Sequence, residues 1–343
     1  MRLIKTLIVD DSAFVRKVIR EILSSNPHIE VVGIARNGEN ALAMAETLKP
    51  DVITCDLNMP ELNGVGFVKE QMARRPIPII ILTASPQDTE QVVEALEAGA
   101  VDFVQKPSTL ATEALRLIRE ELVEKVKAAA NVTCPTAPLV RRGPVPALTV
   151  APAGNFDIVV LGISTGGPQA LRYLLPQFTK DFPVPLVVVL HMPAGYTNPF
   201  AERLAEISQL PVKEAFEGCA LLPRQALLAP GGRHLSFQRE SAGLVKVRLS
   251  HQPPGKPHKP SVDVMFQSAA QTYGKRVLGV VMTGMGNDGT EGAAWIKAQG
   301  GMILTESEES CIIYGMPRCV VESGLSDGAI PLTSMAREIN NRL

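Results

Sequence analysis

The stretch Asp157–Pro168, DIVVLGISTGGP, determines how the larger part of this chain is expected to fold. Its first half is a run of aliphatic residues, which is typical of a strand buried on both faces of a parallel sheet. Small residues then form a turn, and Pro168 suits the first turn of a helix. Ser164 would stand at the carboxyl end of the strand, where open α/β sheets bind ligands. The turn therefore has the pattern of a nucleophile elbow, but a phosphate-binding turn or a plain β–α connection would look the same.

Length and composition limit the possible classes of protein. A chain of 343 residues can form two domains with separate cores. Hydrophobic residues make up 45% of the chain and charged residues 20%, which is typical of a globular protein. The net charge of −1 argues against nucleic-acid binding, and no apolar run is long enough to span a membrane. The five cysteines are widely spaced and form no C-x-x-C pair, so we expect a reducing, cytoplasmic location.

Residues 1–125 alternate between strand-like and helix-like segments. Five β–α units of this kind predict a doubly wound, flavodoxin-like domain, with a parallel sheet covered on both faces. The expected strands are 3–10, 31–35, 52–56, 79–83 and 102–105, and the expected helices lie near 13–24, 38–49, 64–74, 89–98 and 109–129.

Polar side chains stand at the ends of four of these strands. Asp10 and Asp11 end the first strand, Asp56 the third, Thr83 the fourth and Lys106 the fifth. Converging carboxylates repel one another unless a cation lies among them, and oxygen ligands suit Mg²⁺. An aspartate beside Mg²⁺, a lysine and a hydroxyl can accept a phosphoryl group. Any one of these residues could instead cap a helix, but five at matching positions favour a phosphorylation site.

These residues give the region a resemblance to the receiver domain of bacterial response regulators. The motifs that carry it are VDDS at 9–12, DLNMP at 56–60, NG at 63–64, TA at 83–84 and KP at 106–107. The resemblance implies phosphorylation of Asp56, with Thr83 and Lys106 sensing the phosphoryl group. The implied Mg²⁺ ligands are Asp11, Asp56 and the backbone of Asn58, with Asp10 assisting through water. Receivers usually carry an aromatic residue late in the fifth strand, and here Phe103 or Val104 must take that place.

Residues 126–153 are the expected linker between two domains. Prolines at 135, 138, 144, 146 and 152 interrupt them, and they show no periodic apolar pattern. Such a segment cannot form a core, so we expect a semi-extended, proline-rich connector.

Two further buried strands, at 185–190 and 277–282, supply partners for Ser164. His191 follows the first of them, and Asp288 lies in the glycine-rich turn after the second. Alone, His191 could be a structural histidine, and Asp288 could be the N-cap of the next helix. Together with Ser164 they match a nucleophile, a base and the group that orients the base. The order Ser, His, Asp differs from that of α/β-hydrolases, so that fold is disfavoured.

Other nucleophiles and bases are weaker candidates. His234 follows a Pro-Gly-Gly-Arg turn and is the competing base, whereas His251 and His258 lie among prolines and look like loop residues. Cys311 and Cys319 follow no strand-end turn, so ordinary packing is the better interpretation of both.

From residue 154 to 343 the chain resembles the catalytic domain of the chemotaxis protein-glutamate methylesterases, the CheB family. The matching motifs are GISTGGP at 162–168, HMP at 191–193, LAPGG at 228–232, PSVDVMF at 260–266, MTGMGNDG at 282–289 and YGMPR at 314–318. The resemblance implies a Rossmann-like catalytic domain over residues 154–343. Family members commonly have glutamine in place of Leu190 and serine in place of Pro199, two departures beside the crevice that bear on substrate preference.

The resemblance implies a phosphorylation-activated hydrolase that demethylates glutamate methyl esters, and deamidates certain glutamines, on the cytoplasmic domain of a chemoreceptor. Ser164 would attack the ester, His191 would take and return the proton, and Asp288 would fix the histidine tautomer. Backbone amides near Thr165 and Met285 are the candidate oxyanion donors. No cofactor is expected for this chemistry.

The receiver domain is expected to control the esterase. A chemotaxis histidine kinase would be the phosphodonor, and the receiver would cover the crevice until Asp56 is phosphorylated. The alternative is a response regulator whose output domain binds a nucleotide or a partner without chemistry. The absence of the pattern GxxxxGK[ST] weighs against that alternative.

Overall fold

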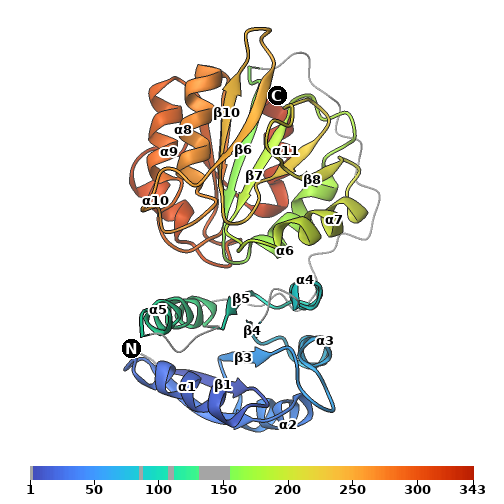
Figure 1. Cartoon of the computed structure of the whole chain (residues 1–343), viewed down its shortest axis with the longest axis vertical. Coiled ribbons are helices and arrows are strands. Elements are labelled where there is room, and N and C mark those ends of the chain that lie inside the picture. The colour runs from blue at the N-terminus through green and yellow to red at the C-terminus, as the bar shows by residue number, and fades with distance from the viewer. Residues whose placement is uncertain (1–2, 85–87, 107–111, 131–154) are drawn as a thin grey trace. The chain divides into compact units, whose positions relative to one another are not determined.

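The computed structural model describes residues 3–84, 88–106, 112–130 and 155–343. These residues belong to two compact units, Met1–Leu139 and Val140–Leu343, whose elements are labelled in Figure 1. Each unit is built on a parallel sheet of its own. Within the described ranges, no helix is long and apolar enough to cross a membrane.

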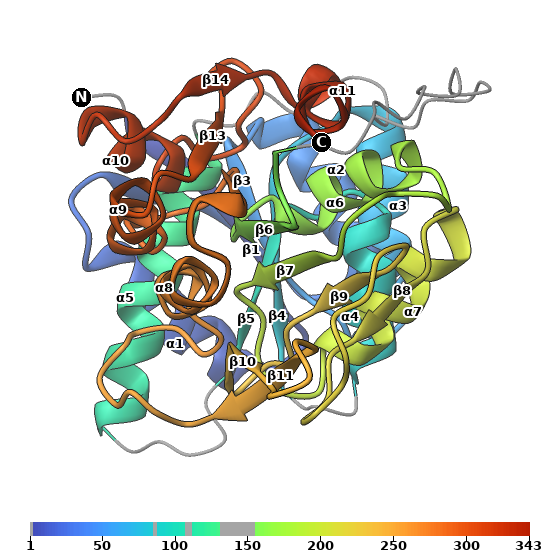
Figure 2. The same ribbon diagram turned by 90° about the horizontal axis from the view of Figure 1, so that it is seen from above.

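The first unit has a five-stranded parallel sheet in the order β2-β1-β3-β4-β5. Helices α1 and α5 pack against each other on one face, and α2, α3 and α4 cover the other face (Figures 1 and 2). The strands are β1 (Ile4–Val9), β2 (Ile29–Ala35), β3 (Val52–Asp56), β4 (Ile79–Thr83) and β5 (Asp102–Gln105). The helices are α1 (Ala13–Ser24), α2 (Gly38–Leu48), α3 (Gly64–Arg74), α4 (Thr89–Glu97) and α5 (Thr112–Ala129).

Local sequence explains these elements well. Every residue of β3 and of β4 is buried, as aliphatic runs covered on both faces require. Polar side chains begin three of the helices. The Ser12 hydroxyl accepts from the Val15 N–H (3.4 Å), and the Asn37 side-chain oxygen accepts from the Asn40 N–H (2.9 Å). Asn63 begins α3 in the same way, and such caps satisfy amides that a helix end leaves free.

The second unit has a seven-stranded parallel sheet in the order β14-β13-β12-β6-β7-β9-β8. Its strands are β6 (Ile158–Ile163), β7 (Leu186–Leu190), β8 (Val212–Glu214), β9 (Ala226–Leu228), β12 (Val277–Val281), β13 (Met302–Glu306) and β14 (Gly328–Ile330). A separate antiparallel hairpin consists of β10 (His234–Arg239) and β11 (Val245–Ser250). The helices are α6 (Gly167–Leu174), α7 (Thr197–Ile207), α8 (Val262–Tyr273), α9 (Thr290–Ala298), α10 (Met316–Glu322) and α11 (Leu332–Arg342).

The sheet of the second unit is covered on both faces. Helices α8 and α9 pack against each other on one face, and α6 and α11 pack on the other (Figure 2). The prediction of two doubly wound parallel sheets is therefore confirmed. The sequence analysis missed the strands β8, β9, β13 and β14 and the hairpin β10–β11. Strands β8, β9 and β14 have three residues each, which is too few for a hydrophobic period to show.

The predicted linker, residues 126–153, lies mainly outside the described residues. Its first four residues, 126–129, overlap the helix expected over 109–129, and they belong to α5, which ends at Ala129 as that expected helix does. Val126 and Ala129 are fully buried in a core that includes Ile19 and Leu23 of α1, so packing against α1 stabilises the last turn of this helix.

Candidate active site

Ser164 stands directly after β6, in the turn that leads into α6. Its N–H donates to the Thr283 carbonyl (3.0 Å), and its carbonyl accepts from the Gly167 N–H (2.7 Å). Gly166 has φ +79°, and a Cβ there would lie 2.6 Å from Cβ of Ile312, so this position requires glycine. Pro168 lies in the first turn of α6, as predicted. The turn therefore holds the Ser164 backbone from both sides and leaves its hydroxyl partly exposed.

His191 stands directly after β7, the strand beside β6. Its N–H donates to the Ile163 carbonyl (3.1 Å), which continues the pairing of the two strands. The side chain turns to Ser164, with Nδ1 3.0 Å from Oγ. The histidine and the serine are thus within hydrogen-bond distance because their strands are neighbours.

Asp288 follows β12, the neighbour of β6 on the other side. Its Oδ2 lies 2.8 Å from Nε2 of His191. In the order β12-β6-β7, the strands that follow β6 in the sequence lie on both sides of it. Such a switch point opens a crevice at the carboxyl edge of a parallel sheet. The structure brings together the three residues that the sequence singled out at this crevice.

The interpretation of Asp288 as the N-cap of the next helix is wrong. Gly289 is the N-cap of α9. The amides at the start of that helix donate to Asp263 instead: Oδ1 of Asp263 accepts from the N–H groups of Gly289 and Gly292, each at 2.8 Å. Asp263 belongs to α8, so a side chain of one helix caps its neighbour and leaves the Asp288 carboxylate available to His191.

Asp288 in turn caps the N-terminus of α8. Its carboxylate accepts from Ser261 Oγ (2.8 Å), the Val262 N–H (2.7 Å) and the Asp263 N–H (3.0 Å). Burial raises the pKa of Asp288, but the hydrogen bonds from His191 and from the two amides outweigh burial and hold the pKa well below its usual range. The carboxylate is therefore ionised at neutral pH.

An ionised Asp288 determines the tautomer of His191. A carboxylate can only accept, so Nε2 of His191 carries the ring proton and donates it to Oδ2. Nδ1 is then left with a lone pair directed at the Ser164 hydroxyl. The arrangement fits a serine, a base and an orienting carboxylate.

Two backbone segments lie next to Ser164. Gly284 packs so closely that a Cβ there would lie 2.7 Å from Cβ of Ser164. Thr283 Oγ1 donates to the Thr165 carbonyl (3.0 Å), which joins the serine turn to the turn after β12. Thr165 is buried and Met285 is partly exposed. Of the candidate oxyanion residues, Thr165 therefore lies in the serine turn itself and Met285 in a segment that contacts this turn.

Sequence reasoning missed Glu306, the last residue of β13. It is fully buried and accepts from the Thr283 N–H (2.9 Å) and from Ser310 Oγ (2.9 Å). Burial raises the pKa of Glu306 to about 7, although these two hydrogen bonds act in the opposite direction. Strand β13 was not among the predicted strands, so nothing in the sequence placed this carboxyl behind the serine turn.

Sequence reasoning also missed His258. The ring of His258 stacks on that of His191, with a centroid distance of 4.1 Å and an interplanar angle of 16°.

The competing base His234 is buried, and burial is the largest cause of its lowered pKa. No hydrogen bond in the described part of the chain joins His234 to Ser164.

Neither Cys311 nor Cys319 makes a hydrogen bond to the Ser164, His191 or Asp288 side chain in the described part of the chain. Burial, together with the neighbouring Glu306, raises the pKa of Cys311 far above that of an ordinary thiol. The Cys319 thiol donates to the Gly286 carbonyl, with Sγ 3.6 Å from the oxygen.

The two departures from the family pattern differ in burial. Leu190 is 1% exposed beneath the serine turn, and Pro199 is partly buried in the first turn of α7.

The first unit contains a second polar cluster, also at the carboxyl edge of its sheet. Carboxylate oxygens of Asp10, Asp11 and Asp56 all lie within 4.8 Å of one another. Lys106 Nζ contacts Asp10 Oδ2 (2.7 Å) and Asp56 Oδ1 (2.9 Å). Burial raises the pKa of Asp56 despite this lysine, and the charge of Asp10 raises it further. A set of clustered carboxylate oxygens fits Mg²⁺, which prefers such ligands.

The residues predicted to sense the phosphoryl group lie beside this cluster. Thr83 ends β4, and its hydroxyl donates to Asp88 Oδ2 (3.2 Å). Asn58 Nδ2 donates to the other oxygen of Asp88 (3.0 Å). The Lys106 N–H donates to the Thr83 carbonyl (2.6 Å), which joins the ends of β4 and β5. The predicted receiver residues therefore end neighbouring strands of one sheet.

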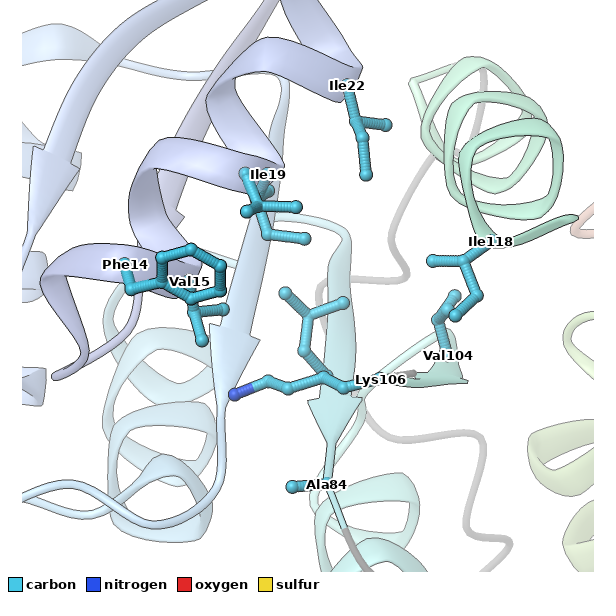
Figure 3. Close-up of a pocket in the computed structure, with 10 residues that line it drawn as sticks. Phe14, Val15, Ile19, Ile22, Ala84, Val104, Lys106 and Ile118 are labelled. Carbon is cyan, nitrogen blue, oxygen red and sulfur yellow. The ribbon is translucent and has the colours of Figure 1, made fainter. Parts of the chain in front are cut away.

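A cavity of about 180 Å³ lies near this cluster, between α1, β4, β5 and α5. Figure 3 shows Phe14, Ile19 and Ile22 on one side of it and Val104 and Ile118 on the other. Lys106 is the charged residue in this lining, and its amino group binds Asp10 and Asp56. Among the described residues, the cavity therefore adds no second reactive group to the cluster.

Both units match families of known proteins. The family model described as CheB methylesterase matches residues 159–339, and that of the response regulator receiver domain matches residues 6–117. A protein-glutamate methylesterase/protein-glutamine glutaminase 5 of Myxococcus xanthus is 46% identical over 97% of this chain and 96% of its own length. A protein-glutamate methylesterase/protein-glutamine glutaminase of Halalkalibacterium halodurans is 43% identical over 98% of this chain and 97% of its own length.

A solved structure agrees with these similarities. The crystal structure of the CheB methylesterase catalytic domain of Thermotoga maritima is similar to 55% of this chain, at 38% identity and a TM-score of 0.54. The similarity covers 99% of that catalytic domain.

Proposed function

The chain belongs to the CheB methylesterase family and carries a response regulator receiver domain, and we propose that its Ser164, His191 and Asp288 hydrolyse glutamate methyl esters on chemoreceptors. It is a protein-glutamate methylesterase/protein-glutamine glutaminase by its 46% identity to a protein of that name over 97% of the chain. The hydrogen-bonded series from Ser164 through His191 to Asp288 is the observation that carries the catalytic proposal.

The first chemical step is attack by Ser164 on the ester carbonyl carbon. His191 Nδ1, 3.0 Å from Oγ, accepts the hydroxyl proton as the C–O bond forms. The tetrahedral intermediate then expels methoxide, and His191 Nδ1 returns the proton so that methanol leaves. The product of this step is a glutamyl ester of Ser164.

The second step is hydrolysis of that ester. His191 Nδ1 takes a proton from water, hydroxide adds to the carbonyl carbon, and Ser164 Oγ leaves and recovers the proton. The products are a glutamate carboxylate and the free enzyme. Attack on a glutamine side chain would follow the same path, with ammonia in place of methanol.

Asp288 and the adjoining amides support the charges that form. The imidazolium of His191 is stabilised by the ionised carboxylate 2.8 Å from Nε2. We assign the oxyanion to the backbone amides of Thr165 and Met285, because Thr165 follows Ser164 in the same turn and Met285 follows Gly284, which packs against Ser164.

We further propose that Asp56 receives a phosphoryl group from a chemotaxis histidine kinase, and that this raises esterase activity. The two donors on Asp56, the Leu57 N–H and Lys106 Nζ, both bind Oδ1. Among the described residues, no donor binds Oδ2, so this oxygen is the nucleophile. Lys106 and the Thr83 hydroxyl would then bind phosphoryl oxygens.

Phosphorylation is proposed to require Mg²⁺, held by Asp11, Asp56 and the backbone of Asn58, with Asp10 assisting through water. When bound, the ion neutralises charge among the carboxylates and the phosphoryl oxygens. We place the whole reaction in the cytoplasm, where the kinase and the cytoplasmic domain of the receptor would lie.

The test is methanol release from a methylated chemoreceptor fragment, with and without a small-molecule phosphodonor and Mg²⁺. We expect wild-type enzyme to release methanol, Ser164→Ala to release none, and the phosphodonor to accelerate release by wild type but not by Asp56→Asn. Release that survives in Ser164→Ala would overturn the nucleophile. Full stimulation of Asp56→Asn would overturn the control scheme, and no release by wild type would favour a binding module.

A further inference from the structure

The residues between β11 and α8 form a loop, residues 251–261, that is fixed to the active site at several points. The Gly232 N–H donates to the Lys259 carbonyl (2.9 Å). Lys256 Nζ contacts Asp263 (3.2 Å) and Glu291 (2.6 Å), at the ends of α8 and α9 that face Asp288. Ser261 completes the loop with its hydrogen bond to Asp288. The loop therefore has a defined position beside the triad.

His258 projects from this loop onto His191. The two imidazoles are nearly parallel, at 16°, and their centroids are 4.1 Å apart. Such a separation is that of stacked rings in contact. The His191 side chain is only 5% exposed, and the His258 ring covers one of its faces.

The hydrogen bonds and the stack restrain different motions of His191. Ser164 and Asp288 bind the two ring nitrogens and lie near the plane of the ring. Rotation about the bond that joins the imidazole to Cβ has broad minima, so the ring can tilt out of that plane. A flat partner on one face resists this tilt, whereas a partner in the plane does so only weakly.

The restraint that the stacked ring places on His191 matters most after the first chemical step. In the acyl-enzyme, Ser164 Oγ is esterified and no longer has a hydrogen for Nδ1 of His191. Asp288 alone then holds the ring by a hydrogen bond, while Nδ1 must be aimed at the attacking water. The stack with His258 contains no atom that acylation modifies, so it can retain the ring orientation that the serine no longer provides.

We propose that His258 is a positioning residue for the hydrolytic step, and that it acts through the stacked face of His191. This inference rests on the proposed esterase function of Ser164, His191 and Asp288. It assigns no proton transfer to His258, because a flat ring of similar size is the property that the stack needs.

The experiment is quenched-flow measurement of methanol release by the full-length enzyme from a methylated receptor fragment. His258→Ala removes the ring, His258→Leu keeps the bulk without a flat face, and His258→Phe keeps a flat face without nitrogen atoms. His251→Ala, in the same loop and exposed, is the matched control. Ser164→Ala tests the underlying activity, and thermal unfolding of each variant reports whether it is folded.

We expect His258→Ala and His258→Leu to lower kcat about three- to tenfold and to lower KM with it, so that kcat/KM, which reports acylation, stays unchanged. Both should release one equivalent of methanol per enzyme in a burst before the slower steady state, since hydrolysis of the acyl-enzyme becomes limiting. His258→Phe should restore the wild-type rate and abolish any new burst, and His251→Ala should match wild type.

Three results would overturn the inference. One is an unchanged rate in folded His258→Ala, and another is a slow rate in His258→Phe as well, which would mean that the imidazole itself reacts. The third is a loss of kcat without a burst. None of these bears on the proposed function, which fails only if wild-type release is absent or does not need Ser164.

Discussion

Asp56 and Asp288 occupy matching places in the two units, but their acidities change in opposite directions. Asp56 ends β3 and Asp288 follows β12, each at the carboxyl edge of a parallel sheet. They are 7% and 8% exposed, so they are equally buried. Burial raises the pKa of Asp56. Burial acts on Asp288 too, but hydrogen bonds lower its pKa well below the usual range. Burial alone therefore does not set the charge of these groups.

The number and kind of donors account for the difference. Asp288 accepts from His191, from the Ser261 hydroxyl and from two amides at the start of α8. Asp56 accepts from one amide and from Lys106, which it shares with Asp10. A carboxylate that must stay ionised and in place is surrounded by donors. One that must react keeps an oxygen open and a like charge nearby.

The largest effect that this comparison predicts is that of Asp288→Asn on catalysis. The side-chain amide would offer a hydrogen to Nε2 of His191, favour the wrong tautomer and place a hydrogen on Nδ1 that opposes the serine. By analogy with serine hydrolases, kcat should fall about 10³- to 10⁴-fold. Steady-state methanol release measures this loss, while phosphorylation of Asp56 by a small-molecule donor should not change.

The matched control is Asp181→Asn, because that aspartate is exposed and its nearest cation, Arg224, is 3.8 Å away. It should retain wild-type kcat. A fall of less than tenfold in folded Asp288→Asn would contradict the assignment of Asp288 as the group that orients His191.

Glu306 sharpens the comparison, since it is a third buried carboxyl and has two donors, the Thr283 N–H and the Ser310 hydroxyl, neither of which is charged. Its raised pKa, about 7 against an ordinary 4.5, means that the folded chain binds a proton more tightly than the unfolded chain does. Stability should therefore be greatest below the unfolded pKa and should fall as the pH rises from about 4.5 to about 7. The expected loss is on the order of 3 kcal/mol.

Glu306→Gln should remove this loss, because the amide can still accept from the Thr283 N–H but carries no charge. Denaturant unfolding at pH 4.5 to 8 measures it. The free energy of unfolding of the variant, relative to wild type, should rise with pH over that window and level off above it. Glu308→Gln, at an exposed neighbour, should show no such rise. Parallel curves for Glu306→Gln and wild type would mean that Glu306 is ionised throughout.

Much of the fold and the core of the candidate site could be predicted because they depend on strand ends. Ser164, His191 and Asp288 each come directly after, or a few residues beyond, an aliphatic run, and parallel strands deliver their ends to one edge. The same reasoning collected Asp10, Asp56 and the other receiver residues. Hydrophobic runs and turn residues are local properties, so one sequence contains them.

The residues that support the site could not be predicted in this way, because their roles come from contacts between distant segments. Asp263 caps α9 from a position on α8, which no local pattern reports. His258 lies in a proline-rich loop, and only the tertiary fold brings its ring to His191. Glu306 ends a strand whose mixed sequence, MILTE, gave no clear signal. Residues 126–129 were expected both as helix and as linker, and the burial of Val126 and Ala129 against α1 is what assigns them to α5.

The smallest predicted effect, that of Asp56→Asn on stability, bears directly on the opening contrast. Because the pKa of Asp56 is raised, its ionised form costs the folded state free energy at neutral pH, and removal of the charge should stabilise the first unit. The gain should be only about 1 kcal/mol, because two effects oppose each other. The substitution relieves the repulsion between Asp56 and Asp10, but it also removes one of the two carboxylate partners of Lys106. Hydrogen exchange of the β3 and β4 amides in the full chain, without Mg²⁺, measures the stability of the first unit separately from that of the second.

The control is Glu46→Gln, at an exposed residue of α2, which should leave the exchange of the same amides unchanged. Faster exchange in Asp56→Asn would mean that the bond to Lys106 outweighs the burial and the repulsion, and that Asp56 resembles Asp288 more closely than their donors suggest.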